Sequence, residues 1–163
     1  MVKKLSVSTR APKSLNKDKI KGETEKIIEK IAELQKVFYA SGKKGLLVVL
    51  QGLDASGKDG LVGKVFKGVN PLGCTVHAFK APTEEELAHD FLWRVHKAIP
   101  RKGMIQIFNR SHYEDVLITR VENWIEDKTA KSRFSHINNF EKLITDNDTI
   151  IFKFYLYLPT LII

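Results

Sequence analysis

Four short apolar runs along the chain have the length and composition of β-strands. The first, "LLVVL" at residues 46–50, contains no polar residue and is flanked by Gly45 and Gly52. A continuous apolar run of this length is typical of a strand buried on both faces, as in a parallel sheet. The other three runs are "CTVHAF" at 74–79, "MIQIF" at 104–108 and "TIIFKFYL" at 149–156.

Around these runs, apolar residues recur at the three- and four-residue spacing of amphipathic helices. The expected helices span residues 23–39, 58–66, 84–98, 113–124 and 133–145. Thr83 followed by Glu86 is a capping-box pattern at the start of the third of them. Strands that alternate with helices predict an α/β fold with a parallel sheet flanked by helices, in which ligands bind beyond the carboxyl ends of the strands.

Each longer helix has its own candidate core residues at this spacing. They are Ile27, Ile31, Leu34 and Phe38 in the first helix, Leu87, Phe91 and Val95 in the third, Val116, Leu117, Val121 and Trp124 in the fourth, and Ile137, Phe140 and Ile144 in the fifth. Trp93 and Trp124 are both interpreted as core residues, because they fall within predicted helices.

A glycine-rich turn follows the first strand and has the spacing of a phosphate-binding loop. Gly52, Gly57 and Lys58 fit the pattern G-x-x-x-x-G-K between a predicted strand and a predicted helix. Backbone N–H groups, the helix N-terminus and the lysine would together bind phosphate oxygens. The expected phosphate site consists of Gly52, Ala55, Ser56, Gly57, Lys58 and Asp59. The alternative is a strand-to-helix turn with a coincidental lysine.

Two aspartates distinguish this loop from the common pattern. Asp59 occupies the place where a serine or threonine usually contacts Mg²⁺, and an acid there is also favourable simply as a residue of the first helical turn. A carboxylate inside the loop repels phosphate unless a cation lies between them. Asp54 is therefore a candidate magnesium ligand or partner of the attacking phosphate, with a turn-stabilising aspartate as the alternative.

A second polar cluster, "FNRSHYEDVL", follows the third strand. Asn109 lies at the end of the strand, where proteins with such a phosphate-binding loop often have an acidic metal ligand. Arg110 has the planar guanidinium that suits phosphate oxygens, with a surface ion pair as the alternative. Glu114 and Asp115 begin the next helix, where acids are also favourable through the helix dipole alone.

The net charge of +8 is concentrated near the N-terminus. Residues 1–44 contain twelve Lys and Arg against five Asp and Glu, a balance of +7. This segment is either a solvated arm and helix face or a surface for a polyanion. No recognisable nucleic-acid-binding motif is present, and no apolar run approaches the roughly 20 residues of a membrane span. The single cysteine, Cys74, favours a reducing cytoplasm. We expect a basic arm at 1–20 and one domain at 21–163.

Four ordered blocks resemble the polyphosphate kinase 2 family: "GLDASGKDG", "GVNPLGCTVHAFKAPT", "FLWRVHKAIPRKG" and "FNRSHYEDVLITRV". The resemblance implies a three-layer P-loop kinase-like fold. It also implies phosphoryl transfer between inorganic polyphosphate and a nucleoside mono- or diphosphate, AMP or ADP, with Mg²⁺ as cofactor. Guanine nucleotides are an alternative to adenine nucleotides. Nucleic acid and membrane are not expected as partners.

The resemblance assigns roles to individual residues. Lys58 would bind the phosphates in transfer, Asp54 would bind magnesium or orient the acceptor phosphate, and Arg110 would stabilise the transferred charge. Asn109, where many members carry Asp, and Asp115 would complete the metal site. Lys80 in "FKAPT" is either a phosphate contact or a solvated lysine.

The end of the chain departs from the family pattern. Members continue past the fourth strand into long helices that form a basic lid, whereas this sequence reads "YLPTLII" and stops. The expectation is a C-terminally truncated chain without the lid, and association into a homo-oligomer. Two alternative functions stay open: an inactive nucleotide- or polyphosphate-binding remnant, and an ATP-dependent P-loop kinase of small nucleotides.

Overall fold

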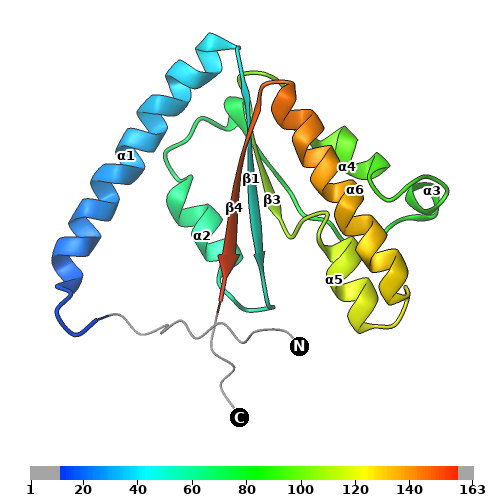
Figure 1. Cartoon of the computed structure of the whole chain (residues 1–163). Helices are drawn as coiled ribbons and strands as arrows, with labels where there is room; N and C mark the ends of the chain where they lie inside the picture. The colour runs from blue at the N-terminus through cyan, green and yellow to red at the C-terminus, as the bar shows by residue number, and fades with distance from the viewer. Residues whose placement is uncertain (1–11, 158–163) are drawn as a thin grey trace.

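The computed structural model describes residues 12–157, which form a parallel sheet covered by helices on both faces (Figure 1). In chain order the elements are α1 (Lys17–Ser41), β1 (Gly45–Gly52), α2 (Lys58–Val65), the 3₁₀ turn η1 (Pro71–Gly73), β2 (Cys74–His77), α3 (Glu84–Leu87), α4 (Trp93–Ala98), β3 (Ile105–Asn109), α5 (Glu114–Val121), α6 (Asp127–Asp146) and β4 (Thr149–Leu156).

The four strands lie in the order β2-β3-β1-β4, and every neighbouring pair is parallel. β1 therefore has a strand on each side, as its uninterrupted apolar run predicts. Its last residues, Leu50 and Gly52, pair with Asn109 of β3 and Leu156 of β4. The loop that follows β1 thus emerges at the middle of the carboxyl edge, between the ends of two other strands.

Alternate residues of β1 supply the two halves of the core. Leu47 and Val49 pack with buried residues of α4, α5 and α6 on one face. Val48 and Leu50 pack with apolar residues of α1 and α2 on the other. Figure 1 shows this division, with α1 and α2 on one side of the sheet and α3 to α6 on the other. The expected α/β fold, a parallel sheet flanked by helices in three layers, is confirmed.

The prediction of one continuous helix over 84–98 is wrong. The capping box of Thr83 and Glu86 is present, but α3 ends after one turn and α4 begins only at Trp93. Between them the carboxylate of Asp90 accepts a hydrogen bond from the backbone N–H of Leu92 (2.9 Å) and starts a new turn. Local hydrogen bonding of this kind competes with the helix. Val95 is fully buried, whereas Leu87 is exposed.

The first helix is longer than predicted. Asn16 caps it, because its side chain accepts hydrogen bonds from two backbone N–H groups of the first turn, so α1 begins at Lys17. It ends at Gly42, which has the left-handed conformation (φ +58°). The end of the arm predicted at 1–20 is therefore helical, and residues 1–11 lie outside the described part of the chain.

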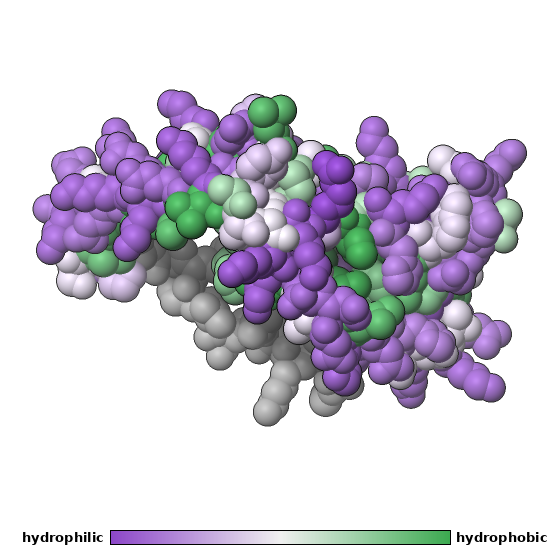
Figure 2. All heavy atoms as spheres, turned by 90° about the horizontal axis from the view of Figure 1, so that it is seen from above, coloured by the Kyte–Doolittle hydropathy of each residue, from purple (hydrophilic) through white to green (hydrophobic). Residues whose placement is uncertain are grey.

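The apolar pattern of α1 overstates how much of this helix is buried. Phe38 packs against the sheet and Gln35 is buried, but Ile27 and Leu34 are mostly exposed. Hydrophilic side chains cover most of this helix in Figure 2, on the left of the view. No helix within residues 12–157 has the length and apolar character needed to cross a bilayer.

The predicted core of the last two helices is confirmed for α6 and partly wrong for α5. Ile137, Phe140 and Ile144 are buried against the sheet. On α5, Val116 is buried, but the apolar residues that follow it turn outward. They are Leu117, Val121 and Trp124, all exposed. α5 already ends at Val121, so Trp124 lies beyond it and is not a core residue.

We expect Ile137→Ala to lower the free energy of unfolding by about 2–5 kcal/mol, because it removes a fully buried side chain between α6 and the sheet. Chemical denaturation measures this value. The matched control is Leu143→Ala on the same helix, where an exposed side chain is removed. A cost for Ile137→Ala as small as that of the control would contradict the assigned packing.

Candidate functional site

The loop between β1 and α2 has the conformation its glycines allow. Gly57, the residue before α2, has φ +87°, a conformation that side chains rarely adopt. At Gly52 the reason is space, because a Cβ would lie 2.6 Å from the carbonyl oxygen of Leu156 and 2.8 Å from Oγ of Ser56. Ala55 also lies in the left-handed region (φ +60°). Non-glycine residues in this region concentrate at ligand-binding sites.

Lys58 lies across the loop with its ammonium group turned inward. Nζ donates hydrogen bonds to the carbonyl oxygens of Gly52 and Leu53 (2.8 Å each), and it lies 3.3 Å from Oγ of Ser56. Only 7% of the residue is exposed, and within residues 12–157 no carboxylate forms an ion pair with it. The loop therefore holds a nearly buried positive charge that an anion can neutralise.

The loop opens into a cavity of about 610 Å³. Residues from three strand ends line it, because the carboxyl ends of parallel strands meet at one edge of the sheet. Most residues of the predicted site line this cavity: Asp54, Ala55, Ser56, Gly57, Lys58 and Asp59 from the loop after β1, Lys80 from the segment after β2, and Asn109 and Arg110 from the end of β3. Gly52 lines the adjoining cavity.

Two polar pairs close the mouth of this cavity. The guanidinium of Arg110 donates to the carboxylate of Asp54, and the amide of Asn109 donates to the carboxylate of Asp59. The side chain of Asp54 is 83% exposed and that of Arg110 47%. Ion pairs this exposed contribute little to stability. Arg110 can therefore release Asp54 to bind an anionic ligand, and Asp54 can bind a cation instead.

The predicted metal ligand Asp115 lies away from the loop cavity, in a buried ion pair with Arg94. Nη2 of Arg94 donates to both carboxylate oxygens of Asp115 (3.0 Å each). Nη1 of Arg94 donates to the carbonyl oxygen of Lys80 (2.9 Å), and the guanidinium lies over the ring of Phe79. The ion pair thus fixes the segment that carries Lys80 against the start of α5.

Arg94 is a site residue that sequence reasoning missed. The apolar periodicity of this segment singles out only Leu87, Phe91 and Val95, whereas in the structure Arg94 is also buried in α4. The signal that could have revealed it was its place inside the block "FLWRVHKAIPRKG". A charged residue in such a block, among apolar neighbours, suggests a buried partner of opposite charge.

A second cavity of about 580 Å³ adjoins the first and shares Asp54, Lys80 and Arg110 with it. Apolar and aromatic side chains also line it: Pro82, Leu117, Ile118, Val121, Trp124 and Tyr155. The exposed apolar residues of the α5 region, Trp124 among them, therefore share a cavity with the charged residues Lys80 and Arg110. Such a combination suits a ligand with an aromatic part and an anionic part.

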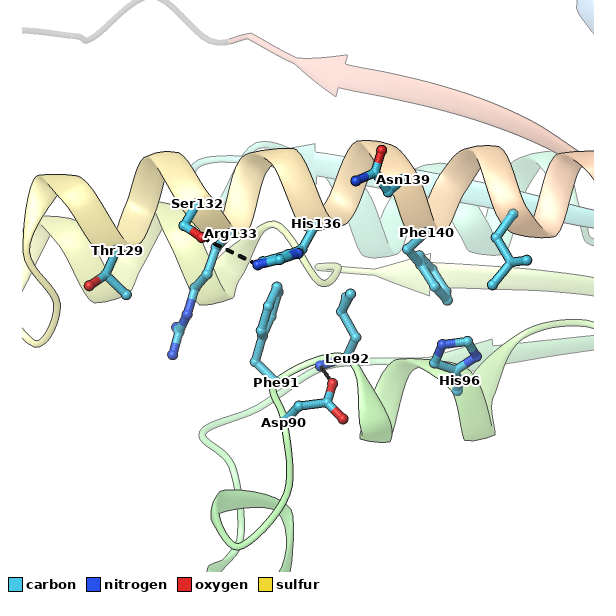
Figure 3. Close-up of a pocket in the computed structure, with 11 residues that line it drawn as sticks. Asp90, Phe91, Leu92, His96, Thr129, Ser132, Arg133, His136, Asn139 and Phe140 are labelled. Carbon is cyan, nitrogen blue, oxygen red and sulfur yellow. Dashed lines mark hydrogen bonds between the residues drawn. The ribbon is translucent and has the colours of Figure 1, made fainter.

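A third cavity, of about 600 Å³, lies between α4 and α6 (Figure 3). Phe91, Leu92 and Phe140 form much of its wall. Two of its polar side chains form a hydrogen bond with each other, with Oγ of Ser132 3.2 Å from Nε2 of His136. No residue of the phosphate loop lines it. We therefore do not assign the chemistry of the protein to this cavity.

Behind Arg110, a buried carboxylate connects α6 to the start of α5 and to β4. Glu141 accepts hydrogen bonds from the hydroxyl of Tyr113 (2.8 Å) and from Nζ of Lys153 (2.6 Å), and Nε2 of His112 lies 3.4 Å away. Burial alone would raise the pKa of Glu141, but the hydrogen bonds from His112, Lys153 and Tyr113 lower it from 4.5 to about 2.

The oxygen donors at the mouth of the loop cavity fit a magnesium ion that is shared with a ligand. Within the described residues, no group of three or more His, Cys, Asp or Glu is arranged to hold a metal by itself. Mg²⁺ commonly keeps several waters and binds one or two carboxylates together with substrate phosphates. The exposed carboxylates of Asp54 and Asp59 match that requirement.

We expect Gly52→Ala to abolish measurable binding of tripolyphosphate, because the added Cβ collides with the backbone of Leu156 and forces the loop open. Gly63→Ala on α2 is the matched control, since a Cβ there meets no atom within 4 Å and alanine favours the helix. Isothermal titration calorimetry measures both. Normal binding by Gly52→Ala would show that the loop tolerates a wider conformation.

The lowered pKa of Glu141 predicts a specific loss of stability in acid. Between about pH 4.5 and pH 2 the unfolded state binds a proton on this carboxyl that the folded state does not, so the free energy of unfolding falls as the pH is lowered. Urea denaturation at about pH 6 and about pH 3 measures the loss. In Glu141→Gln the loss should be smaller, because this position no longer titrates. Equal losses in the two proteins would contradict the assignment.

The comparisons with known proteins agree with this geometry. The sequence matches the family model for Polyphosphate kinase 2 (PPK2) over residues 14–160. The AMP/ADP-polyphosphate phosphotransferase of Meiothermus ruber is 51% identical over 129 residues, which are 79% of this chain and 48% of that protein. The ADP-polyphosphate phosphotransferase of Rhodopseudomonas palustris is 41% identical over 143 residues, 80% of this chain and 50% of that protein. The chain spans about half the length of these curated relatives.

Solved structures show the same likeness. The crystal structure of polyphosphate kinase 2 from Arthrobacter aurescens TC1 superimposes with a TM-score of 0.87 at 39% identity, over 94% of this chain and 56% of that chain. The P-loop kinase-like fold expected from the resemblance is thereby confirmed. With a family match over most of its length, this chain belongs to the polyphosphate kinase 2 family.

Proposed function

We propose that the protein transfers a phosphoryl group between inorganic polyphosphate and a nucleoside mono- or diphosphate. The observation that carries the proposal is the nearly buried ammonium group of Lys58, held by loop carbonyls at the bottom of a cavity whose other walls present Lys80 and Arg110. Both substrates are polyanions, and these cations offset their mutual repulsion.

The cationic residues and the backbone of the loop cavity have distinct roles in this reaction. Lys58 leaves its carbonyl partners to bind oxygens of the transferred phosphoryl group, while the backbone N–H groups of the loop and the start of α2 bind the neighbouring phosphate. The guanidinium of Arg110 leaves the carboxylate of Asp54 and binds the negative charge that develops on the phosphoryl group in the transition state. An acceptor that is already an anionic phosphate needs no strong general base, so positioning and electrostatic stabilisation supply the rate.

Mg²⁺ would be held by Asp54 and the amide oxygen of Asn109, with Asp59 beside them. The ion would neutralise phosphate charge, as divalent cations do in phosphoryl transfer. We do not include Asp115 among its ligands, because both oxygens of that carboxylate accept hydrogen bonds from Arg94 inside the core. Asp115 instead supports the wall of the site.

The second cavity is the proposed place of the acceptor nucleoside. Its apolar lining residues Trp124, Val121 and Pro82 suit a base, and its charged lining residues Lys80 and Arg110 suit the phosphates. The names of the relatives support AMP and ADP as acceptors, since one is an AMP/ADP-polyphosphate phosphotransferase and another an ADP-polyphosphate phosphotransferase. Guanine nucleotides, a homo-oligomeric state and a cytoplasmic location remain predictions.

The test is incubation with Mg²⁺, polyphosphate and either AMP or ADP, with the product nucleotide followed by chromatography. Lys58→Ala should lower the rate at least about 100-fold, because it removes a charge that stabilises the transition state. Lys64→Ala is the control, as it removes an exposed lysine from the same helix.

Other outcomes of this assay distinguish the alternatives. Absence of product, together with calorimetric binding of ADP or polyphosphate, would favour a binding protein. Phosphorylation of AMP in a parallel reaction with ATP in place of polyphosphate, and none with polyphosphate, would favour an ATP-dependent nucleotide kinase. A rate in Lys58→Ala equal to that of the control would remove Lys58 from the proposed mechanism.

A further inference from the structure

We propose that Glu141, a buried residue of α6, is a positioning residue for Arg110, and this inference rests on the phosphate-binding role proposed above for Arg110. Glu141 does not line the loop cavity. It acts through His112 and Tyr113, which follow Arg110 in the chain and contact its carboxylate. The inference adds to the site a group from α6, a helix that contributes no residue to the loop cavity.

The first step of the argument is the backbone of Arg110. This residue has φ +64°, the left-handed region that a residue with a long side chain rarely occupies. Its backbone N–H donates to the carbonyl oxygen of Leu50 at the end of β1 (3.2 Å). The turn directs the guanidinium to Asp54, across the mouth of the cavity. A conformation of this kind persists only when its surroundings hold it in place.

The second step is what holds the turn on its far side. Ser111 and His112 are fully buried, and Oγ of Ser111 donates to the side-chain oxygen of Gln51 on β1 (3.1 Å). The next two side chains contact a single carboxylate, since Tyr113 donates to Oε1 of Glu141 and Nε2 of His112 lies against the same oxygen. The turn at Arg110 is therefore fixed by β1 on one side and by α6 on the other.

The third step is the position of Glu141 itself. Its second oxygen, Oε2, accepts a hydrogen bond from Nζ of Lys153 on β4 (2.6 Å). Nζ of Lys153 also lies 3.2 Å from the hydroxyl of Tyr113. The carboxylate is thus held by donors from β4 and from the start of α5. A displaced Glu141 would release the two side chains that restrain the turn, and Arg110 could then relax to an ordinary negative φ.

The contact with His112 has a further consequence. Nδ1 of His112 is buried and has no hydrogen-bond partner within residues 12–157. Nε2, the nitrogen that faces Glu141, is therefore the polar atom by which the ring is oriented. An apolar residue could fill the volume of Glu141 in the core, but it could orient neither His112 nor Tyr113. The carboxylate of Glu141 therefore serves to orient His112 and Tyr113, and not merely to fill the core.

The test compares wild type, Glu141→Gln, Arg110→Ala and the double variant. Tripolyphosphate binding is measured by calorimetry, and the Nε–Hε resonance of Arg110 by NMR. Glu141→Gln should weaken binding about tenfold, as the loss of a supporting residue commonly does. It should also shift the Arg110 resonance. In the Arg110→Ala background it should cause no further weakening, since its effect passes through Arg110.

Two further variants separate positioning from general stability. Tyr113→Phe keeps the ring and removes one hydrogen bond to Glu141, so it should shift the same resonance and weaken binding by a smaller factor. Asp146→Asn removes an exposed carboxylate from α6 and should change neither readout.

Two results would overturn the proposal. One is wild-type binding and an unshifted Arg110 resonance in Glu141→Gln and Tyr113→Phe. The other is an equal weakening by Glu141→Gln with and without Arg110. If the wild-type chain binds no tripolyphosphate at all, the proposed function fails, and the Arg110 resonance alone decides whether Glu141 positions this residue.

Discussion

The organisation of this protein depends on the burial of β1 on all sides. A strand with neighbours at both edges and helices on both faces offers no place for a charged side chain, so its sequence is apolar from Leu46 to Leu50. Polar and charged residues therefore follow the carboxyl end of the strand, where the chain leaves the core. The loop there is flanked by the ends of β3 and β4, which explains why residues far apart in the sequence line one cavity.

The charged groups around the site form two kinds of ion pair, one whose partners are fixed and one whose partners can change. Arg94 and Asp115 are buried and paired through two hydrogen bonds, so removing either would leave an uncompensated charge in the core. Asp54 and Arg110 are paired at the surface, where the interaction is weak and partners can change. The fixed pair holds the segment of Lys80 against the start of α5, and the exchangeable pair lines the loop cavity. Residues of the same chemical types thus perform different tasks according to their burial.

The sequence predicted the strands and the loop well because both depend on local rules. An apolar run has few alternatives to a buried strand, and the spacing of Gly52, Gly57 and Lys58 is set by the geometry of the turn itself. The residues at the strand ends were also placed together correctly, since a parallel sheet brings those ends to one edge.

The errors arose where hydrogen bonds or an open cavity override the apolar periodicity. Leu87, Phe91 and Val95 have helical spacing, but Asp90 offers the backbone a competing hydrogen bond, and the helix breaks. Arg94 and Asp115 meet only after that break, so no spacing rule reveals their pairing. The sequence pattern predicts a core residue at Trp124 because it falls within a predicted helix, yet Trp124 lies beyond the end of α5 and lines an open cavity. Periodicity cannot distinguish a side chain that faces the core from one that faces a ligand.

The close approach of Gly52 to Leu156 also determines when the loop can form during folding. Gly52 is the last residue of β1 and Leu156 the last residue of β4, and the two strands pair along their whole length although β2, β3 and the helices α2 to α6 lie between them in sequence. Contacts between such distant segments have a large loop-closure entropy and form slowly. The wall of the loop that Leu156 supplies is therefore absent until β4 has docked. A chain that is still being synthesised carries the complete loop sequence long before it carries a loop of the right shape.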